Sequence, residues 1–327
     1  MTIAFVLQTF KDPDQIERLV TTLVRGTDRR LVVVNHSGPE SERMRLAAFP
    51  GIDRSIPSPG GRGSFGVIEA LISSMRWLER QNTPYEWLAV MSGQDYPIRP
   101  LAELESELSA SVYDGHFWHF DAMNERESSQ PPMRWTTREA TDRYLFHYAP
   151  LKANPHTLDR AILKIPRLLI ARTKNYRLET SFGVMLGRRP ARTPFSQEFK
   201  LYGGSYWMII RRTAVRAALE LVDERPDIVN YFRHVISPEE SFLQTVLAND
   251  KRLSLSRQEL RLWDFENGRH GFARFFGVED LEHLCASGRY IARKFDRARD
   301  SRILDELDRI VLDSAARRPK SLRLASG

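Results

Sequence analysis

Apolar runs and helix-like segments alternate along the first hundred residues, and this alternation limits the folds that the chain can adopt. Each apolar run is short and unbroken, which is typical of a strand buried on both faces of a sheet. Each segment between the runs repeats its apolar residues with the helical period. The expected strands are 3–7, 31–34 and 87–91, and the expected helices are 13–24 and 67–78. This order predicts an α/β fold with a mostly parallel central sheet and flanking helices.

Sheets of this kind bind ligands beyond the carboxyl ends of their strands. Segments 8–14, 35–38 and 92–97 follow expected strands and should therefore line a site. Polar residues at these positions are placed to contact a ligand, and our candidates are Gln8, Gln94 and Asp95. A plain turn is the alternative for 92–97, because glycine, aspartate and proline also form turns. The glycine-dense loop 58–66 matches neither a P-loop nor a dinucleotide-binding motif.

The organisation of the chain is less regular after the first sheet segments. We divide it into an α/β half at 1–112, a basic and aromatic insertion at 113–200 that shapes an acceptor site, a second half at 201–313, and a basic tail at 314–327. Strand patterns are expected at 116–120 and 202–210, and a helix at 213–221. The chain of 327 residues is long enough to form one large α/β domain.

Composition excludes several classes of protein. With 42% hydrophobic and 28% charged residues, the chain is neither disordered nor fibrous. The single cysteine, Cys285, excludes an internal disulfide and argues against a cysteine-based zinc site. No apolar run is long enough to span a bilayer, and the first residues lack the features of a signal peptide. We therefore expect a cytoplasmic protein.

The net charge of +7 is concentrated between residues 160 and 200. This stretch holds ten lysines and arginines and only two glutamates. A phosphorylated ligand, an acidic glycan or an anionic membrane surface could bind there, and a solvated basic face is the alternative. Nucleic acid is not an expected partner, because no known binding module accompanies the charge.

The segment SPEESFLQTVL, residues 237–247, begins an apolar-faced helix pattern with two adjacent carboxylates. One interpretation is a capping box, in which Ser237 is the N-cap, Pro238 the first helical residue and Glu240 the reciprocal carboxylate. The other interpretation is a catalytic base. The residues of this segment alone favour the cap.

Five ordered blocks resemble one enzyme family. The most distinctive is SGQDYPIRP at 92–100, and the others are FVLQTFKDPDQIERLVTTL at 5–23, GGSYWMIIRRTAV at 203–215, SPEESFLQTVL at 237–247 and ARKFD at 292–296. They resemble glycosyltransferase family 14, which comprises the core-2/I-branching N-acetylglucosaminyltransferases and the peptide O-xylosyltransferases. The resemblance runs from about residue 3 to residue 296 and is weakest between 121 and 200.

This resemblance implies a GT-A-like fold and an inverting transfer of a sugar from UDP to an acceptor hydroxyl. Such a transfer needs one base to take the acceptor proton. The family's base is the second acidic residue of its Ser-Pro-Asp-Glu motif, which corresponds to Glu240, and Glu239 is the neighbour most easily confused with it.

The resemblance also implies how the leaving diphosphate is stabilised. Metal-free members use basic side chains, which correspond to Arg293 and Lys294, and a second family arginine corresponds to Arg269 or, next, to Arg274. We therefore expect no metal and no cofactor besides the UDP-sugar co-substrate. A metal-dependent enzyme that uses Asp95 is the alternative. The literal Asp-x-Asp at residues 12–14 is interpreted as the start of a helix.

The expected sugar and acceptor contacts are Gly204, Ser205, Tyr206, Trp207 and Trp263. An aromatic face packs well on a sugar ring, but burial in the core is the alternative, and alternation along a strand should send one of Tyr206 and Trp207 into the core. The resemblance implies N-acetylglucosamine or xylose as the transferred sugar, and the expected setting is surface or capsular polysaccharide synthesis at the inner membrane face. A non-catalytic module that binds nucleotide sugar or glycan is the competing hypothesis.

Overall fold

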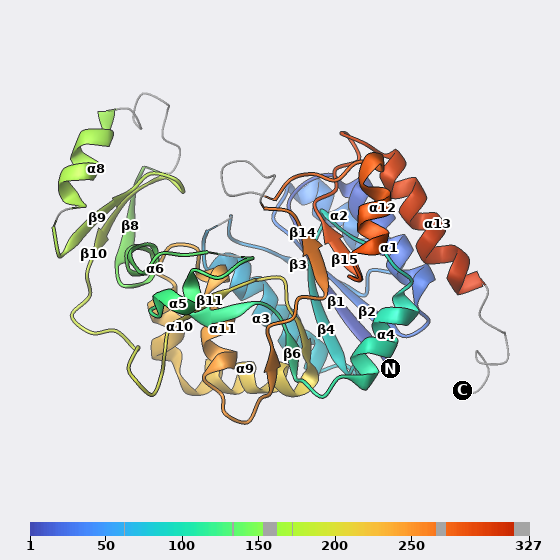
Figure 1. The fold of residues 1–327 in the computed structure, drawn as a ribbon, viewed down its shortest axis with the longest axis horizontal. Coiled ribbons are helices and arrows are strands. Elements are labelled where there is room, and N and C mark those ends of the chain that lie inside the picture. The colour runs from blue at the N-terminus through green and yellow to red at the C-terminus, as the bar shows by residue number, and fades with distance from the viewer. Residues whose placement is uncertain (62, 133, 153–161, 172, 266–272, 317–327) are drawn as a thin grey trace.

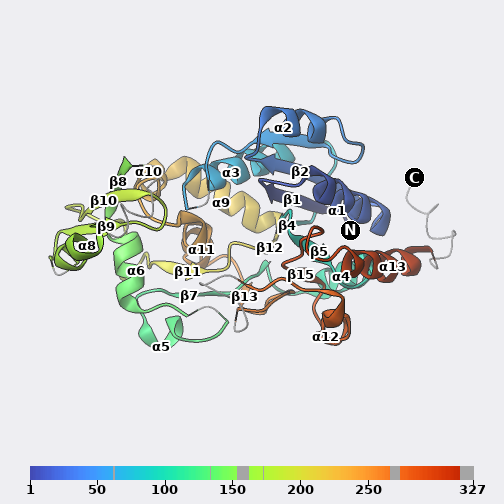
Figure 2. The ribbon, with the colours of Figure 1, turned by 90° about the horizontal axis from the view of Figure 1, so that it is seen from above.

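The computed structural model describes residues 1–61, 63–132, 134–152, 162–171, 173–265 and 273–316. A seven-stranded sheet forms its centre, and helices cover both faces (Figures 1 and 2). From one edge to the other the strands are β3 (Arg54–Pro57), β2 (Arg30–His36), β1 (Ile3–Thr9), β4 (Trp87–Ser92), β12 (Ile209–Arg211), β6 (Gly115–His116) and β13 (Leu255–Ser256).

The central sheet is mostly parallel. Strand β1 runs parallel to β2 and β4, and β2 runs parallel to β3. Strand β12 is antiparallel to its neighbours β4 and β6, whereas β13 is parallel to β6. The fold class predicted from the alternating sequence is therefore confirmed.

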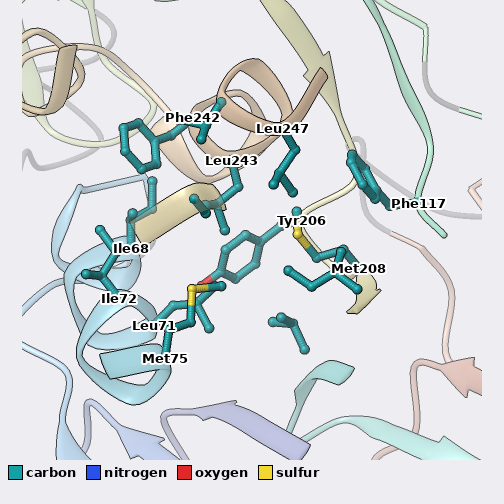
Figure 3. Close-up of a cluster of buried hydrophobic side chains, with 14 of the residues drawn as sticks. Ile68, Leu71, Ile72, Met75, Phe117, Tyr206, Met208, Phe242, Leu243 and Leu247 are labelled. Atoms are coloured by element: carbon teal, nitrogen blue, oxygen red, sulfur yellow. The ribbon is translucent and has the colours of Figure 1, made fainter. Parts of the chain in front are cut away.

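Alternate residues of the central strands enter two separate cores, because successive side chains of a strand point to opposite faces. In β1, Ala4 and Val6 join one core, whereas Ile3, Phe5 and Leu7 join the other. The first core, part of which is shown in Figure 3, is covered by α3 (Gly66–Glu79), α9 (Arg212–Glu224), α10 (Pro226–Phe232) and α11 (Phe242–Ala248). The second is covered by α1 (Pro13–Gly26), α4 (Leu101–Ala110) and α13 (Arg302–Ala316).

Three smaller sheets surround the central one. They are β11 (Tyr202–Gly204) with β7 (His119–Asp121); β14 (Arg261–Trp263), β15 (Ile291–Arg293) and β5 (Asp95–Pro97); and β8 (His147–Lys152), β10 (Val184–Arg188) and β9 (Tyr176–Glu179). The other described helices are α2 (Glu40–Ala47), α5 (Glu125–Ser128), α6 (Thr137–Tyr144), α8 (Lys164–Ile170) and α12 (Leu281–Ala286), with 3₁₀ turns at Pro238–Glu240 and Val278–Asp280. These described helices include none that is both long and apolar enough to cross a membrane.

The expected helices at 13–24, 67–78 and 213–221 are present as α1, α3 and α9, each slightly longer than its apolar pattern. The Asp-x-Asp at residues 12–14 starts α1 as expected, since the Asp12 side chain accepts a hydrogen bond from the Gln15 backbone nitrogen at 3.2 Å. Two expected strands are instead divided between sheets. Segment 116–120 contributes to β6 and β7, and segment 202–210 contributes to β11 and β12.

The insertion at 113–200 has two parts. Its first residues supply β6 to the central sheet, so this part of the segment belongs to the central body. Its later residues form the β8–β10–β9 sheet and α8, which lie at the opposite end of the molecule from α13 in both views (Figures 1 and 2). Helix α6 lies between this outer sheet and the central body (Figure 1).

Candidate functional site

The three-stranded β14–β15–β5 sheet aligns three of the predicted site residues. Strand β15 pairs with β5 so that Arg293 lies opposite Asp95, and with β14 so that Arg293 lies opposite Trp263. The SGQDYP and ARKFD blocks, about two hundred residues apart in the sequence, thus become neighbouring strands.

Asp95 lies inside this sheet with a side chain that is 0% exposed. Its carboxylate accepts hydrogen bonds from the Ser92 backbone nitrogen at 2.7 Å and from the Ser92 hydroxyl at 3.1 Å. It also lies 3.6 Å from an Arg261 guanidinium nitrogen and 3.5 Å from Nε of Arg293. A buried carboxylate held in this way cannot contact a sugar donor directly, so we reassign Asp95 from donor contact to a residue that holds Arg293 in place.

Arg293 rests on the ring of Trp207. The centre of its guanidinium lies 4.2 Å from the ring centroid, which is a cation–π distance. The Arg293 side chain is 12% exposed, so it is not the solvated residue that the alternative interpretation required. Trp207 therefore supports the cation, with one face of its ring covered. Lys294 follows as a half-buried residue whose Nζ lies 5.6 Å from the Phe275 ring centroid.

The turn between β11 and β12 depends on Gly204. Its φ is +155°, and a Cβ on this residue would lie 2.0 Å from the Trp118 carbonyl oxygen, so no larger residue fits. The next residue, Ser205, is buried and donates its backbone N–H to the same carbonyl at 2.8 Å. This sharp change of direction is why segment 202–210 supplies strands to two different sheets.

Tyr206 lies in the first core, where Figure 3 shows its ring among side chains of α3 and α11. It is 4% exposed, and its hydroxyl donates to the Val67 carbonyl at 3.4 Å. Burial and then the Glu239 carboxylate raise the pKa of this phenol well above its usual value. We therefore remove Tyr206 from the predicted sugar contacts, and the expectation that one of Tyr206 and Trp207 would enter the core is met.

Gln244 of α11 connects this turn to the acidic segment. Its side-chain amide donates to the Ser205 carbonyl at 2.8 Å and to the Glu239 carbonyl at 3.1 Å. The GGSYW and SPEES blocks are therefore held together by one buried side chain, which lies within residues 237–247 but was not among the predicted site residues.

The capping box at Ser237 does not form, and this interpretation was wrong. Residues Pro238–Glu240 are a separate 3₁₀ turn, and α11 begins only at Phe242. Ser237 makes no side-chain cap, has a left-handed φ of 50°, and accepts a hydrogen bond from the Tyr144 hydroxyl through its carbonyl at 3.0 Å. The Glu240 carboxylate turns away toward a cation instead of returning to the Ser237 backbone.

The two adjacent glutamates have different surroundings. Glu239 accepts a hydrogen bond from the Gly63 backbone nitrogen at 3.2 Å and so holds the glycine-dense loop. Glu240 forms an ion pair through Oε2 with Arg143 at 2.7 Å, and its side chain is 28% exposed. Glu240 is thus partly exposed and oriented by a guanidinium, which suits a base, although Glu239 is also partly exposed.

Arg143 belongs to α6 and was not predicted from the sequence. It also pairs with Glu139, one helical turn away, and its guanidinium lies 5.1 Å from the Trp135 ring centroid. Burial lowers the pKa of Arg143, but the Glu240 and Glu139 carboxylates outweigh burial and raise it overall. An arginine four residues after a glutamate is common on helix surfaces, so the sequence held no signal of its second partner.

The described part of the structure gives Gln8 and Gln94 no contact that assigns them a role. Gln8 is buried, its carbonyl accepts from the Gly93 backbone nitrogen at 3.2 Å, and its amide nitrogen has no hydrogen-bond partner among the described residues. Gln94 is half-buried and, with Gly93, lines a small hollow near Lys11. A larger groove between α3 and α10 is lined by none of the predicted site residues.

The second family arginine stays a prediction. Arg269 lies outside the described residues. The next candidate, Arg274, forms ion pairs with Asp264 at 2.5 Å and with Asp280 at 2.6 Å, which suits a structural role. Among the described residues, no group of three or more histidine, cysteine, aspartate and glutamate side chains could hold a metal ion.

A buried carboxylate, Glu259, lies beside the predicted site and was also missed. It accepts a hydrogen bond from the Trp118 backbone nitrogen at 2.9 Å and interacts with Ser205 and Arg261. Burial raises the pKa of Glu259 to about 7, although these partners oppose the shift. Arg261 itself is fully buried and donates to the Trp207 carbonyl at 2.5 Å, so it connects Glu259, Trp207 and Asp95.

Comparison with solved structures finds distant likenesses. A glucose-1-phosphate thymidylyltransferase from Bacillus anthracis in complex with sucrose is 9% identical, with a TM-score of 0.35, over 88% of this chain and 96% of that chain. A 4-diphosphocytidyl-2C-methyl-D-erythritol synthase from Anaerococcus prevotii is 10% identical, with a TM-score of 0.33, over 88% of this chain and 97% of that chain. Such values carry no argument about activity. No curated protein matches the sequence.

The family comparison is more informative. The model of the core-2/I-branching enzymes matches residues 3–285, which is most of the chain. This range contains the SGQDYP, GGSYW and SPEES blocks that converge around Gly204. The match and the α/β sheet agree with the expected GT-A-like fold. The chain therefore belongs to the core-2/I-branching enzyme family, a family of glycosyltransferases.

Proposed function

We propose that the chain is an inverting, metal-independent glycosyltransferase that moves N-acetylglucosamine or xylose from a UDP donor to an acceptor hydroxyl. Glu240 is the base in this proposal, and Arg293 with Lys294 stabilises the leaving diphosphate. The observation that carries it is the convergence of distant sequence blocks on the Gly204–Trp207 turn. Gln244 binds the turn from the side of the acidic segment, and Arg293 stacks on Trp207 from the other side.

The reaction is a single displacement. The acceptor oxygen attacks the anomeric carbon, the bond from that carbon to the diphosphate oxygen breaks, and the configuration inverts. The acceptor proton passes to the Glu240 carboxylate, and the bonding electrons leave with UDP. Because Oε2 is engaged by Arg143, the ion pair orients the carboxylate while the exposed part of the side chain faces solvent.

The growing negative charge on UDP needs a fixed positive charge. Arg293 is suited to this role because its guanidinium is fixed before a ligand arrives, by Asp95 on one side and by the Trp207 ring below. Lys294 adds a second cation from the next residue of the same strand end. Trp263, paired with Arg293 across β14 and β15, offers a half-buried aromatic ring to the sugar or the nucleoside.

Metal independence is supported by the surroundings of Asp95. A metal-dependent enzyme would use this carboxylate, but here it is buried and balances the charges of Arg261 and Arg293. Coordination of a divalent ion would require the carboxylate to leave both arginines, and their charges would then lie uncompensated in a buried sheet.

The biological setting we propose is the synthesis of a surface or capsular polysaccharide. The acceptor is then a growing glycan, and the enzyme works at the inner face of the membrane as a peripheral protein. The basic stretch between residues 160 and 200 supports this placement, because anionic lipids attract clustered lysines and arginines.

A screen of UDP release tests the proposal. The purified chain is incubated with individual UDP-sugars, including UDP-N-acetylglucosamine and UDP-xylose, in excess EDTA and separately with manganese. We expect release from one of these two sugar donors in EDTA, without further stimulation by manganese. Release that occurs only with manganese would support the metal-dependent alternative, and no release from either sugar donor would contradict the proposed specificity.

A further inference from the structure

The outer end of the molecule carries an apolar helix face. Helix α8 and the β8–β10–β9 sheet project from the central body, with α8 outermost in both views (Figures 1 and 2). Four aliphatic side chains of this region are between 58% and 70% exposed: Ile162, Ile165, Leu168 and Leu169. Large apolar groups clustered on a surface mark an interaction site more often than chance exposure does.

The burial pattern shows that α8 has two apolar faces. Leu163, Pro166 and Ile170 are half-buried and recur with helical spacing, so they form the face toward the outer sheet. Ile165 and Leu168 are three residues apart and form the outward face with Leu169. A helix that needed only to cover the outer sheet would expose polar residues on this second face.

The chain around and after α8 carries exposed positive charge. Lys174, Arg188 and Arg192 are exposed, and none of them forms an ion pair within the described part of the chain. Arg167, within α8, lies 3.6 Å from the Glu179 carboxylate and donates a hydrogen bond to the Thr180 hydroxyl at 3.4 Å. From residue 160 to residue 200 the sequence has ten basic and two acidic residues.

We infer that α8 docks on an anionic lipid bilayer, with Ile162, Ile165, Leu168 and Leu169 inserted at the boundary between headgroups and acyl chains. Aliphatic residues on one helix face with lysines and arginines around them are the pattern of interfacial membrane helices. The exposed cations of this outer region attract the anionic headgroups, which holds the apolar side chains at the interface. This inference deepens the membrane association proposed above by naming the surface and the residues that bind.

Charge complementarity favours lipid over a second copy of the chain. Two copies meeting through this face would bring two clusters of unpaired cations together, and like charges at an interface oppose association. An anionic bilayer instead supplies negative charge around an apolar interior, which matches both parts of the face.

The docking face is connected to the proposed base. In the outer sheet, Nε of Arg177 forms an ion pair with Asp142 of α6 at 2.5 Å. The next residue of α6 is Arg143, which holds Glu240 at 2.7 Å. The outer sheet beside α8 therefore contacts the same helix, α6, that supplies the partner of Glu240.

Vesicle sedimentation of the full chain tests this inference. Vesicles of phosphatidylcholine with about 30% phosphatidylglycerol are compared with pure phosphatidylcholine at about 50 mM and about 500 mM salt. We expect the chain to sediment with the anionic vesicles at low salt and to be released at high salt. Ile165→Ser with Leu168→Ser should weaken binding at least about tenfold, and Lys174→Gln with Arg188→Gln and Arg192→Gln should do the same and reduce the salt dependence.

Matched controls separate local from general effects. Met44→Ser with Val112→Ser removes two comparably exposed apolar residues elsewhere, and Arg25→Gln with Arg29→Gln and Lys251→Gln removes the same charge from other surfaces. Both should bind as the original chain does. The inference is overturned if the original chain stays in the supernatant, if the α8 variant binds normally, or if ultracentrifugation shows a dimer that the α8 variant loses. UDP release without lipid should be unchanged in every variant, so failure here leaves the proposed transfer reaction intact.

Discussion

The two ends of the candidate site are built differently. At the base end, a partly exposed Glu240 is held by Arg143, which comes from a helix of the insertion. At the cation end, Arg293 is held by Asp95, whose buried carboxylate also compensates the fully buried Arg261. The base end thus rests on a partly exposed arginine that pairs with Glu240 and Glu139, and the cation end rests on a shared buried network.

This difference predicts where substitutions will act. An ion pair that is accessible to solvent contributes little to folding, so changes at the base end should alter the rate of transfer more than the stability. A buried carboxylate between two arginines cannot be removed without leaving uncompensated charge, so changes at the cation end should alter folding and binding together.

The largest expected effect is the loss of transfer in Glu240→Gln. Without a carboxylate at position 240, no group takes the proton of the attacking hydroxyl in the transition state, and kcat should fall by about a thousandfold or more. The affinity for UDP, measured by calorimetry, should remain within about twofold, because the amide keeps the size of the side chain.

Glu239→Gln is the matched control for this substitution. Its carboxylate holds the Gly63 loop, so the amide should lower activity far less than the change at Glu240. If Glu239→Gln abolishes turnover and Glu240→Gln does not, Glu239 is the base. The base end of the site then consists of Glu239 and its contacts instead of Glu240 and Arg143.

The second effect is destabilisation by Asp95→Asn. This change removes the counter-charge of Arg261 and Arg293 inside a sheet, and breaking a buried ion pair from one side costs about 3 kcal/mol or more. Urea denaturation should show this loss, and UDP binding should weaken with it. Asp227→Asn breaks an exposed ion pair with Arg225 and should cost less than about 1 kcal/mol. Equal losses in both variants would remove the distinction between the buried network and a surface pair.

How far the sequence predicts this molecule also differs between the two ends. The strands and helices of the central body follow from buried apolar runs and helical periodicity, because tertiary packing reinforces both signals there. The cation end follows from the ARKFD and SGQDYP blocks, although only the strand register shows that Asp95 is buried opposite Arg293.

The base end could be predicted only in part. The resemblance predicts Glu240 as the base, whereas its partner Arg143 lies in the insertion, where family likeness is weakest. The capping box failed because the left-handed backbone of Ser237 and the attraction of Arg143 for Glu240 are set by contacts with residues almost a hundred positions away. Local sequence patterns contain no information on such contacts.

A third expected effect concerns pH and the buried network. The carboxyl of Glu259 has its pKa raised from an ordinary 4.5 to about 7 in the folded chain. Between these values the folded state keeps a proton that the unfolded state has released, so stability falls as the pH rises through this window. The free energy of unfolding, relative to that of Glu259→Gln, should fall by up to about 3 kcal/mol across it. Parallel stability curves for the two proteins would contradict the assigned burial.

The smallest expected effect separates positioning from chemistry at the base end. Arg143→Gln removes the cation that orients Glu240 but leaves the base in place, so kcat should fall by about tenfold with little change in KM. Arg143→Lys keeps a cation and should recover part of the rate, because a lysine supplies charge without the planar geometry of the guanidinium. A purely structural Arg143 would instead lower stability in both variants and leave the kcat of the folded fraction unchanged. Since the two side chains of its ion pair with Glu240 are 26% and 28% exposed, urea denaturation should show a loss below about 1 kcal/mol, and a larger loss would place Arg143 with the buried network.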